Sequence, residues 1–470
     1  MRLIKAGEVI DEYKTIFGIR SIKLDLEENF CFYVNGEKFF AMGSNWVPVD
    51  GLHSRDAERL PKCLEMLDDI GCNIVRCWGG NVYENDIFYD FCDRHGILVW
   101  QDFGMACGNY PTDEDFQSRL REEAISVVKR LRAHPCIAVW SGDNENDQGM
   151  VPNGIDPNRN LLTRKVLPEV LFKHDPRRPY IPSSPFFDED MFKGKKRITE
   201  DHLWGPRDYY KNKFYTDSDC YFASEMGYHG CPSPSSIRKF CRPDKVWPYK
   251  DNMDWFGHCT NPIEDPNGMF NYRVELMANQ IGELFGEIPT DIDRFAKASQ
   301  ISQAEAKKFF IESFRVKKWR KTGIIWWNLI DGWPQFSDAV VDYYYSKKIA
   351  YDYIKRSQQP VCMILGEPEN WGQPVYLCNE FTHDVSVKFK ITNVRTGETV
   401  WQGDASAPAN TNVRIGNIKY FHARHEFYLI EWTTSDGVEG KNHYLAGHPG
   451  FDLDEYVALA EKAGLINYVE

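Results

Sequence analysis

Eight short apolar runs alternate with helix-like segments between Phe39 and Asp331. Strands that alternate with helices are typical of a parallel sheet with crossover helices, and eight strands is the number that closes a (β/α)8 barrel. We therefore predict the α/β class and a (β/α)8 TIM barrel. The expected strands are FFAMGSNW (39–46), CNIVRCWG (72–79), GILVWQDFG (96–104), CIAVWSGDNE (136–145), RPYIPSSP (178–185), RITEDHLW (197–204), CYFASEMG (220–227) and GIIWWNLID (323–331).

The segments between these strands carry helix signals. Leucine and isoleucine recur at helical spacing over residues 60–70, and Gly71 follows them as a C-cap. The sequence SQAE at 302–305 has the form of a capping box, which predicts a helix that begins there and runs to Trp319. We expect the long excursion over residues 228–322 to place extra helices and loops over the active face.

Beyond about Gln359 the pattern changes to alternating strands and polar turns, which is typical of an immunoglobulin-like β-sandwich. The last residues, DLDEYVALAEKAGL, resemble a short amphipathic helix. We divide the chain into a remnant strand of an immunoglobulin-like domain (1–24), a barrel (25–358) and a C-terminal β-sandwich with a terminal helix (359–470).

The formal net charge of -13 disfavours nucleic acid and anionic membranes as partners, because this chain would repel a phosphate surface. The 14 Trp, 24 Tyr and 29 Phe supply flat apolar faces that suit sugars, although most of them must be core. We expect a neutral ligand, and a homo-oligomer is compatible with these properties.

The 13 cysteines contain no CxxC pair, which indicates neither a zinc site nor a disulfide framework. We expect them to be reduced and mostly buried. The N-terminal MRLIKAGEVIDEYK lacks the apolar core of a signal peptide, and no apolar run approaches a membrane span. A cytoplasmic location is therefore expected.

The stretch CIAVWSGDNENDQG (136–149) places five acid and amide side chains directly behind an apolar strand. The ordinary explanation is a solvated loop. A calcium loop fails on spacing, because it needs glycine and glutamate where this chain has Gln148 and Gly154. The third explanation is a catalytic carboxylate at the mouth of a barrel, which requires a second carboxylate behind another strand.

The fourth expected strand ends in Glu145 and the seventh in Glu225. Chemistry in this kind of barrel sits at the C-terminal ends of the strands, so the two side chains should face each other. A carboxyl separation of about 5–5.5 Å is the geometry of a retaining glycosidase. We predict that these two groups lie within about 4.5–6 Å, and that no side chain beyond Gln359 reaches either of them.

Aromatic and polar residues follow the same strand ends. Each tryptophan alone is more often core, but six at one rim favour sugar platforms. A lone His202 is more often a structural histidine, and Asp102 or Asp331 can equally orient a loop or cap a helix. The tryptophans are Trp46, Trp78, Trp140, Trp204, Trp326 and Trp327, and the polar residues are Arg76, Asp102, His202 and Asp331.

From about residue 15 to the C-terminus the chain resembles glycoside hydrolase family 2, and within it the β-mannosidase-like branch. The motifs that carry the resemblance are FGIRSI (17–22), NGEKFFAMGSNWVPVD (35–50), RCWGGNVYENDIFYDFCDRHGILVWQDF (76–103), WSGDNEN (140–146), SEMGYHG (224–230) and WWNLIDGWP (326–334).

The resemblance implies roles for particular residues. Glu145 would be the general acid/base and Glu225 the nucleophile, the same pair that the barrel argument selects. Asn144 would bind the 2-hydroxyl of the sugar, Arg76 would keep the nucleophile ionised, and Trp327 would form the floor of the subsite for the terminal sugar.

Other positions agree with the family only in part. His202 and Trp204 match its His-x-Trp pattern, but the following GPRDYY (205–210) departs from it. Asp143 stands where the β-mannosidases usually have Asn, and EMGYHG (225–230) replaces an aromatic-Gly-aromatic-Gln pattern. The sugar epimer is therefore left open.

The family also has a sugar-binding β-domain and an immunoglobulin-like domain before its barrel, whereas residues 1–24 look like only the last strand of the second. The chain is then either a fragment of a longer protein or a member of a lineage that lost these domains.

These observations predict an exo-acting retaining β-glycosidase, β-mannosidase-like, that acts on an oligosaccharide or glycoside and needs no metal or cofactor. We expect the charge of Glu225 to raise the pKa of Glu145. The alternatives are a β-glucosidase, β-galactosidase or β-glucosaminidase, and a non-catalytic carbohydrate-binding barrel. The predicted substrate-binding residues are Asn144, Arg76, Trp78, His202, Trp204 and Trp327.

Overall fold

The computed structural model describes residues 1–470 except 15–16, 27, 195–198, 260–271 and 467–470. A parallel sheet of eight strands forms the centre of the molecule, in the spatial order β10-β9-β8-β7-β6-β13-β12-β11. Except between β10 and β11, which stand at the two ends of this order, each strand pairs with the next one in the chain, and β13 returns to pair with β6, which confirms the predicted TIM barrel. The strands are β6 (Ala41–Trp46), β7 (Ile74–Cys77), β8 (Leu98–Asp102), β9 (Ile137–Ser141), β10 (Tyr180–Ile181), β11 (Glu200–His202), β12 (Phe222–Glu225) and β13 (Gly323–Trp326).

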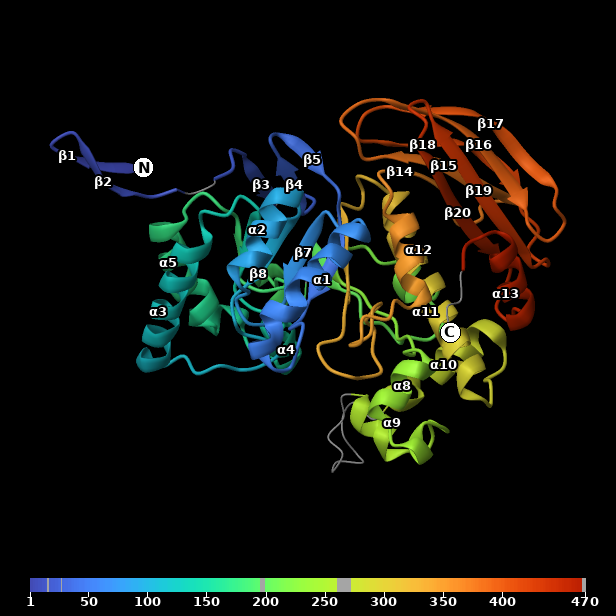
Figure 1. Cartoon of the computed structure of the whole chain (residues 1–470), viewed down its shortest axis with the longest axis horizontal. Coiled ribbons are helices and arrows are strands. Elements are labelled where there is room, and N and C mark those ends of the chain that lie inside the picture. Colours follow the sequence, from blue (N-terminus) through green and yellow to red (C-terminus); the bar gives the residue numbers. More distant parts are fainter. Residues whose placement is uncertain (15–16, 27, 195–198, 260–271, 467–470) are drawn as a thin grey trace.

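Helices connect the strands. They are α1 (Asp56–Asp69), α2 (Asp86–His95), α3 (Glu114–Leu131), α4 (Asn146–Met150), α5 (Leu167–His174), α6 (Glu189–Phe192), α7 (Lys213–Thr216), α8 (Pro234–Phe240), α9 (Met253–His258), α10 (Arg273–Phe285), α11 (Ile292–Arg315) and α12 (Ile349–Ser357). Figure 1 shows α1, α2, α3 and α5 beside the sheet and α8 and α9 projecting away from it. Gly71 has a φ of 84° directly after α1, as the predicted C-cap requires.

The predicted capping box at 302–305 is wrong. Helix α11 begins ten residues earlier, at Ile292, where the Asp291 side chain accepts a hydrogen bond from the Arg294 amide. Ser302 therefore lies inside the helix and donates to the carbonyl of Gln280. The helix ends at Arg315 rather than at Trp319.

A small antiparallel sheet closes the N-terminal end of the barrel. It contains β3 (Ile22–Asp25), β4 (Cys31–Val34) and β5 (Glu37–Phe39). Phe30 and Phe32 pack with Trp100 and Phe222 in one buried cluster inside the barrel, and the Phe30 and Trp100 rings stack at 5.8 Å. This apolar plug leaves the opposite end of the barrel for polar chemistry.

Residues 1–24, where we expected one strand, contain the hairpin β1 (Arg2–Lys5) and β2 (Glu8–Glu12) and most of β3. Every residue of the hairpin strands is exposed, and Figure 1 shows the hairpin extending away from the barrel.

Two antiparallel sheets after α12 form the predicted β-sandwich around a core of their own. One sheet contains β14 (Val361–Leu365), β15 (Gly372–Asn379) and β18 (Asn412–Lys419), and the other contains β16 (Val385–Asn393), β17 (Thr399–Ala407), β19 (Glu426–Thr434) and β20 (Glu439–Ala446). The terminal helix α13 (Leu453–Lys462) packs back on the barrel side, where the rings of Tyr456 and Phe285 are in contact.

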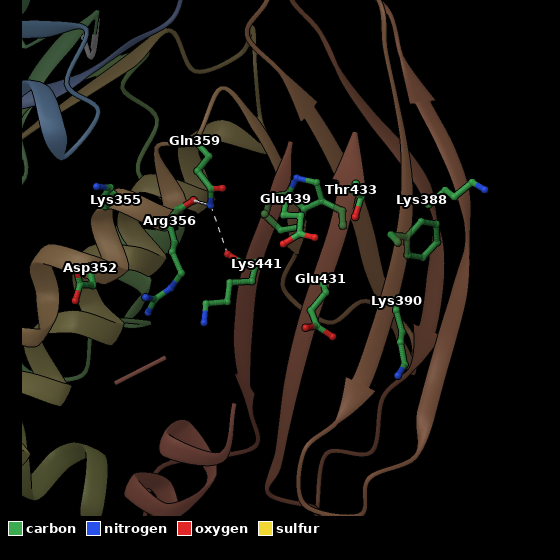
Figure 2. Close-up of a pocket in the computed structure, with 13 residues that line it drawn as sticks. Asp352, Lys355, Arg356, Gln359, Lys388, Lys390, Glu431, Thr433, Glu439 and Lys441 are labelled. Carbon is green, nitrogen blue, oxygen red and sulfur yellow. Dashed lines mark hydrogen bonds between the residues drawn. The ribbon is translucent and has the colours of Figure 1, made fainter. Parts of the chain in front are cut away.

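A groove of about 820 Å³ lies between α12 and the outer face of β16, β19 and β20. Figure 2 shows Gln359 at its rim, where the side-chain amide donates to the carbonyls of Arg356 and Lys441 and so ties α12 to the sandwich. Lysines and glutamates from the strands line the groove (Figure 2).

All 13 cysteines lie in described ranges, none forms a disulfide there, and all but Cys107 are buried, as predicted. None of the helices in the described ranges combines the length and hydropathy that a bilayer crossing demands.

Candidate active site

A cavity of about 770 Å³ opens at the C-terminal ends of the barrel strands. Parallel strands present these ends at one edge, so side chains that follow different strands meet there. Six of the eight predicted catalytic and substrate-binding residues line this cavity, namely Trp78, Asn144, Glu145, Trp204, Glu225 and Trp327. The other two, Arg76 and His202, are buried and hydrogen-bond the two glutamates.

His202 lies between the two glutamates. Its Nδ1 is 2.7 Å from Glu145 Oε1 and 3.5 Å from Glu225 Oε2. One oxygen of each carboxyl group and one nitrogen of His202 all lie within 4.8 Å of one another. The two carboxyl groups are therefore close enough to act on one bond of a substrate.

Arg76 projects into the barrel because of its place in β7. Ile74 packs in the interior cluster, and side chains two residues apart in a strand point to the same face. The guanidinium donates from Nη1 to Glu225 Oε1 at 2.8 Å, and from Nη2 to Asp102 Oδ2 at 2.8 Å and Asn144 Oδ1 at 2.7 Å. Burial opposes its charge, but Asp102 and Glu225 raise the pKa of Arg76 above its ordinary value.

Glu225 is held on both carboxylate oxygens. Arg76 binds Oε1, and the indole N–H of Trp204 donates to Oε2 at 2.8 Å. Burial raises the pKa of Glu225 above its ordinary value, while His202 and Arg76 act to lower it. The two donors fix the direction in which this carboxylate points.

The expectation that Glu225 raises the pKa of Glu145 is not met in this structure. Burial alone would raise the pKa of Glu145, but the hydrogen bond from His202 lowers it below its ordinary value. Burial acts to lower the pKa of His202, and Glu225 and Glu145 outweigh it, so that the pKa of His202 is raised. In the unliganded protein the His202 ring therefore holds a proton more readily than the Glu145 carboxyl does.

The acid and amide cluster behind β9 is not a solvated loop. Asp143 and Asp147 are fully buried. Asp143 accepts hydrogen bonds from the Ser183 hydroxyl and the Asn146 amide, and Asp147 forms an ion pair with Arg164. Burial raises the pKa of Asp143 to about 8. These acids shape the turn from within, and the carboxyl group of Glu145 is left to face the cavity.

Backbone contacts to both neighbouring strands fix the same turn. The Asn144 amide donates to the Met105 carbonyl at 2.9 Å, and the Glu145 amide donates to the Ser184 carbonyl at 2.8 Å. Glu145 has a φ of 60° and is the N-cap of α4. A non-glycine residue in this left-handed region requires such support from its surroundings.

Cys107 is a cavity residue that the sequence analysis did not identify. Asn144 Nδ2 donates to its sulfur at 3.3 Å, and the thiol donates to Glu145 Oε2 at 3.5 Å. Although Cys107 is exposed as a residue, partial desolvation of its sulfur and the neighbouring Glu145 charge raise the pKa of this thiol to about 12, so the group is a neutral thiol. The only feature of the sequence that could have identified Cys107 as a cavity residue was its position directly behind the expected third strand (96–104).

The prediction of six tryptophans at one rim is wrong for three of them. Trp46, Trp140 and Trp326 are buried in the layer between strands and helices, where their indole N–H groups bind Glu84, Asp175 and Gln358. The reason is alternation, because neighbours such as Trp326 and Trp327 must point to opposite faces. Trp78, Trp204 and Trp327 line the cavity, with Trp327 in edge contact with both others.

The two further acids have different places. Asp102 is buried and binds Arg76 and the indole N–H of Trp100. Asp331 accepts hydrogen bonds from Gln335 and Ser337 and is buried away from the cavity, and burial raises its pKa to about 7.

The Glu145, His202 and Glu225 donor atoms are also close enough together to hold a metal ion. Arg76 contacts Glu225 at 2.8 Å, and His202 Nδ1 is engaged with Glu145. A cation there would face the Arg76 guanidinium, so this donor set fits a proton-transfer pair better than a metal centre.

Further charged or polar residues that the sequence analysis did not select line the same cavity, among them Arg207, His229 and Asp338. Two of these three lie within the sequence segments GPRDYY and EMGYHG, which depart from the β-mannosidase pattern. This departure was the signal that could have found them.

Comparison with known proteins defines the class of this barrel. Residues 26–179 match the model of the TIM barrel domain of glycosyl hydrolases family 2. The chain is 31% identical to β-mannosidase B of Aspergillus fumigatus, covering 79% of this chain and 46% of that protein. It is 32% identical to the β-mannosidase of Bos taurus, covering 67% and 38%.

Solved structures agree. The crystal structure of the β-D-mannosidase from Dictyoglomus thermophilum has a TM-score of 0.82 and 31% identity, covering 95% of this chain and 56% of that one. An exo-chitosanase from Amycolatopsis orientalis shares the fold at 19% identity and a TM-score of 0.69. The chain belongs to glycoside hydrolase family 2, in its β-mannosidase-like branch, and spans about half the length of the curated relatives it matches.

Proposed function

We propose that the chain is an exo-acting retaining β-glycosidase that hydrolyses a terminal β-linked hexose by double displacement. The observation that carries the proposal is the pair Glu145 and Glu225, with carboxylate oxygens within 4.8 Å and one buried histidine between them. Retaining glycosidases hold their two carboxyl groups about 5–5.5 Å apart, whereas inverting enzymes leave room for a water between them.

In the first step Glu225 attacks the anomeric carbon and forms a glycosyl ester, while the bond to the leaving oxygen breaks and Glu145 gives that oxygen a proton. Arg76 and Trp204 orient the attacking carboxylate, because each binds one of its oxygens. The developing positive charge on the sugar ring is stabilised by the carboxylate beside it.

The proton for this step comes from the His202–Glu145 pair. The raised pKa of His202 and the lowered pKa of Glu145 place it on His202 Nδ1 in the free protein. Nδ1 is 2.7 Å from Glu145 Oε1, so the proton can pass to Glu145 and then to the leaving oxygen.

In the second step water attacks the anomeric carbon on the face opposite the ester while Glu145 removes a proton from the water. The bond from this carbon to the Glu225 carboxylate breaks, which releases the sugar with its configuration kept. Asn144, held by Arg76, would bind the 2-hydroxyl, and Trp327, Trp78 and Trp204 would form the walls around the sugar ring. These substrate contacts are the part of the proposal taken from family resemblance.

A panel of nitrophenyl β-glycosides assayed on this chain, with the first-formed anomer read by proton NMR, tests the proposal. We expect hydrolysis of a β-hexoside and first release of the β-anomer. First release of the α-anomer would establish inversion and remove Glu225 as nucleophile. Glu225→Gln is the control, since it leaves the cavity in place and should abolish turnover.

A further inference from the structure

Three side chains from three successive loops meet on one wall of the catalytic cavity. Arg207 follows β11, His229 follows β12 and Asp338 follows β13, and each is more than nine-tenths buried. Arg207 Nη1 is 3.5 Å from Asp338 Oδ2 and 3.3 Å from His229 Nδ1, and His229 Nδ1 is 3.1 Å from Asp338 Oδ1. We name these three residues the polar wall.

Contacts outside the cavity hold the polar wall in place. Gly230 donates its amide to the Ser337 carbonyl at 3.0 Å, which brings His229 beside Asp338. Gln303 of α11 donates to the carbonyls of Tyr228 and Asp338, each at 3.0 Å, and so joins the two loops.

One further contact positions the Arg207 backbone, and a glycine allows Trp204 to lie close to Asp338. The Gln280 amide donates to the Arg207 carbonyl at 3.1 Å. A Cβ atom on Gly227 would lie 2.4 Å from the Trp204 ring and 3.0 Å from Asp338 Oδ1, so only glycine lets Trp204 and Asp338 approach each other here.

The polar wall has no net charge at neutral pH. Burial opposes the charge of Asp338, but His229 and Arg207 hold the pKa of this carboxyl well below its ordinary value. Burial lowers the pKa of His229, so the imidazole is neutral and the Asp338 carboxylate balances the Arg207 guanidinium.

The polar wall nevertheless retains hydrogen-bonding capacity. Among the described residues, the Arg207 guanidinium makes no hydrogen bond to a carboxylate and lies instead 4.3 Å above the Trp204 ring. Arg207 Nη1 can donate to His229 Nδ1 at 3.3 Å, so the neutral ring carries its proton on Nε2 and offers it as a donor. Asp338 Oδ1, which has no hydrogen-bond partner among the described residues, is available as an acceptor. Donors and acceptors therefore stand side by side.

We propose that Arg207, His229 and Asp338 are the specificity-determining residues of this site, and that they bind two adjacent hydroxyl groups of a neutral hexose. Each hydroxyl both donates and accepts, which matches the paired donors and acceptors of the polar wall. A uronic acid or an amino sugar would add a charge that this neutral cluster does not balance. This inference rests on the proposed glycosidase function.

In this proposal the two hydroxyls are those on C3 and C4. Trp204 donates to Glu225, which attacks C1, and the Arg207 guanidinium lies 4.3 Å from the centre of the Trp204 ring, so the polar wall adjoins Trp204 and not Glu225 itself. The C2 hydroxyl is next to C1 and within reach of Asn144, which lies beside Glu145. The hydroxyls remote from C1 that are adjacent to each other are those on C3 and C4.

The test compares the best neutral nitrophenyl β-hexoside with its 3-deoxy and 4-deoxy analogues in the wild type and in Arg207→Met. We expect the wild type to prefer the parent by about 100-fold in kcat/KM, because the missing hydroxyl leaves buried polar groups unpaired. In Arg207→Met the preference should fall below about 10-fold, since the hydroxyl has then lost its partner. Arg207→Lys should recover part of it, whereas His229→Gln restores the residue usual in the β-mannosidases and should change which hexoside is preferred.

Arg178→Met is the matched control, because Arg178 pairs with Asp175 at the far end of β9 and should leave the preference unchanged. The role proposed for the polar wall is contradicted by an undiminished preference in Arg207→Met, or by faster hydrolysis of a glucuronide or glucosaminide than of every neutral hexoside. Either result leaves the proposed glycosidase function intact. If the wild type hydrolyses no β-glycoside, the proposed function fails. Saturation-transfer NMR with the methyl β-hexoside and its 4-deoxy analogue then tests whether the polar wall binds the hydroxyl groups. Equal binding of the two sugars contradicts this role, and preferential binding of the parent supports it.

Discussion

Glu145 is contacted on its two carboxylate oxygens by different groups. His202 binds Oε1 at 2.7 Å and the Cys107 thiol binds Oε2 at 3.5 Å. Asn144 links the same thiol to Arg76, so one chain of hydrogen bonds runs from the nucleophile side to the acid/base side. Single substitutions of the residues in this hydrogen-bond network should therefore change proton transfer without removing either glutamate.

Cys107→Ala should lower kcat/KM by about 5–10-fold, because it removes one weak hydrogen bond of about 1 kcal/mol to Glu145. The loss should be larger for a glycoside with a poor leaving group, which needs protonation, than for a dinitrophenyl glycoside. Cys107→Ser is the control and should stay within about 3-fold, since a hydroxyl can donate and accept in the same place. Equal losses for both leaving groups would show that the thiol acts on folding or binding instead.

His202→Asn should move the basic limb of the pH profile of kcat/KM to lower pH. In the wild type this limb should lie above about 6.5, because the pKa of His202 is raised above the ordinary histidine value. Asn can still donate to Glu145 but cannot carry the titrating proton. A basic limb at the same pH in wild type and variant would contradict the proton path through His202.

The two glutamates were predictable from sequence because both follow apolar runs, and a barrel brings strand ends together. The choice among tryptophans was not made correctly, although alternation along a strand already forbids Trp326 and Trp327 from sharing a face. Position behind a strand was the only signal for Cys107, and Asp338 lies too far beyond the expected eighth strand to carry that signal. Both act through contacts with residues distant in sequence.

Helix α11 connects the core of the molecule to the cavity. Sequence alone misplaced its start, because a local capping pattern at 302–305 was outweighed by the true cap at Asp291. The inner face of the helix holds polar residues that a surface helix would not bury. Gln303 is completely buried and donates to three carbonyls of the loops after β12 and β13.

Gln303→Leu should lower the free energy of unfolding by about 2–4 kcal/mol, because buried carbonyl groups lose their partner. It should also raise KM, since the loops that carry His229 and Asp338 lose their link. The control is Gln373→Leu in the sandwich, which loses one buried hydrogen bond to Gly366 and should change stability alone. An unaltered KM in Gln303→Leu would show that α11 does not position the loops of the active site.

The barrel and the sandwich share a buried polar network. Glu305 of α11 accepts hydrogen bonds from His443 of β20 at 2.8 Å and from the Tyr456 hydroxyl of α13 at 2.6 Å. Burial lowers the pKa of His443, so this contact is a hydrogen bond donated by a neutral ring rather than an ion pair. Burial opposes the charge of Glu305, but its hydrogen-bond partners and Lys308 lower the pKa of this carboxyl.

Glu305 should therefore make stability depend on pH. A carboxyl with a lowered pKa stabilises the fold above its unfolded value of about 4.3, and this contribution is lost as the pH falls through the folded value. The Tm of the wild type should thus fall more steeply below about pH 4.5 than the Tm of Glu305→Gln. The exposed Glu431→Gln in the groove of Figure 2 is the control and should follow the wild type. Parallel profiles for all three proteins would contradict this role of Glu305.

The account as a whole depends on the separate roles of the two carboxyl groups, and the stereochemistry of azide rescue tests it most directly. In Glu145→Ala an activated aryl glycoside should still form the glycosyl ester on Glu225, and azide in the vacated space should release the β-glycosyl azide. In Glu225→Ala no ester can form, activity should fall by about 10⁵-fold or more, and azide should give the α-glycosyl azide by one displacement. NMR of the two products reads both roles at once. Opposite anomers are the predicted result, and the same anomer from both variants, or undiminished hydrolysis in either, would contradict the assignment.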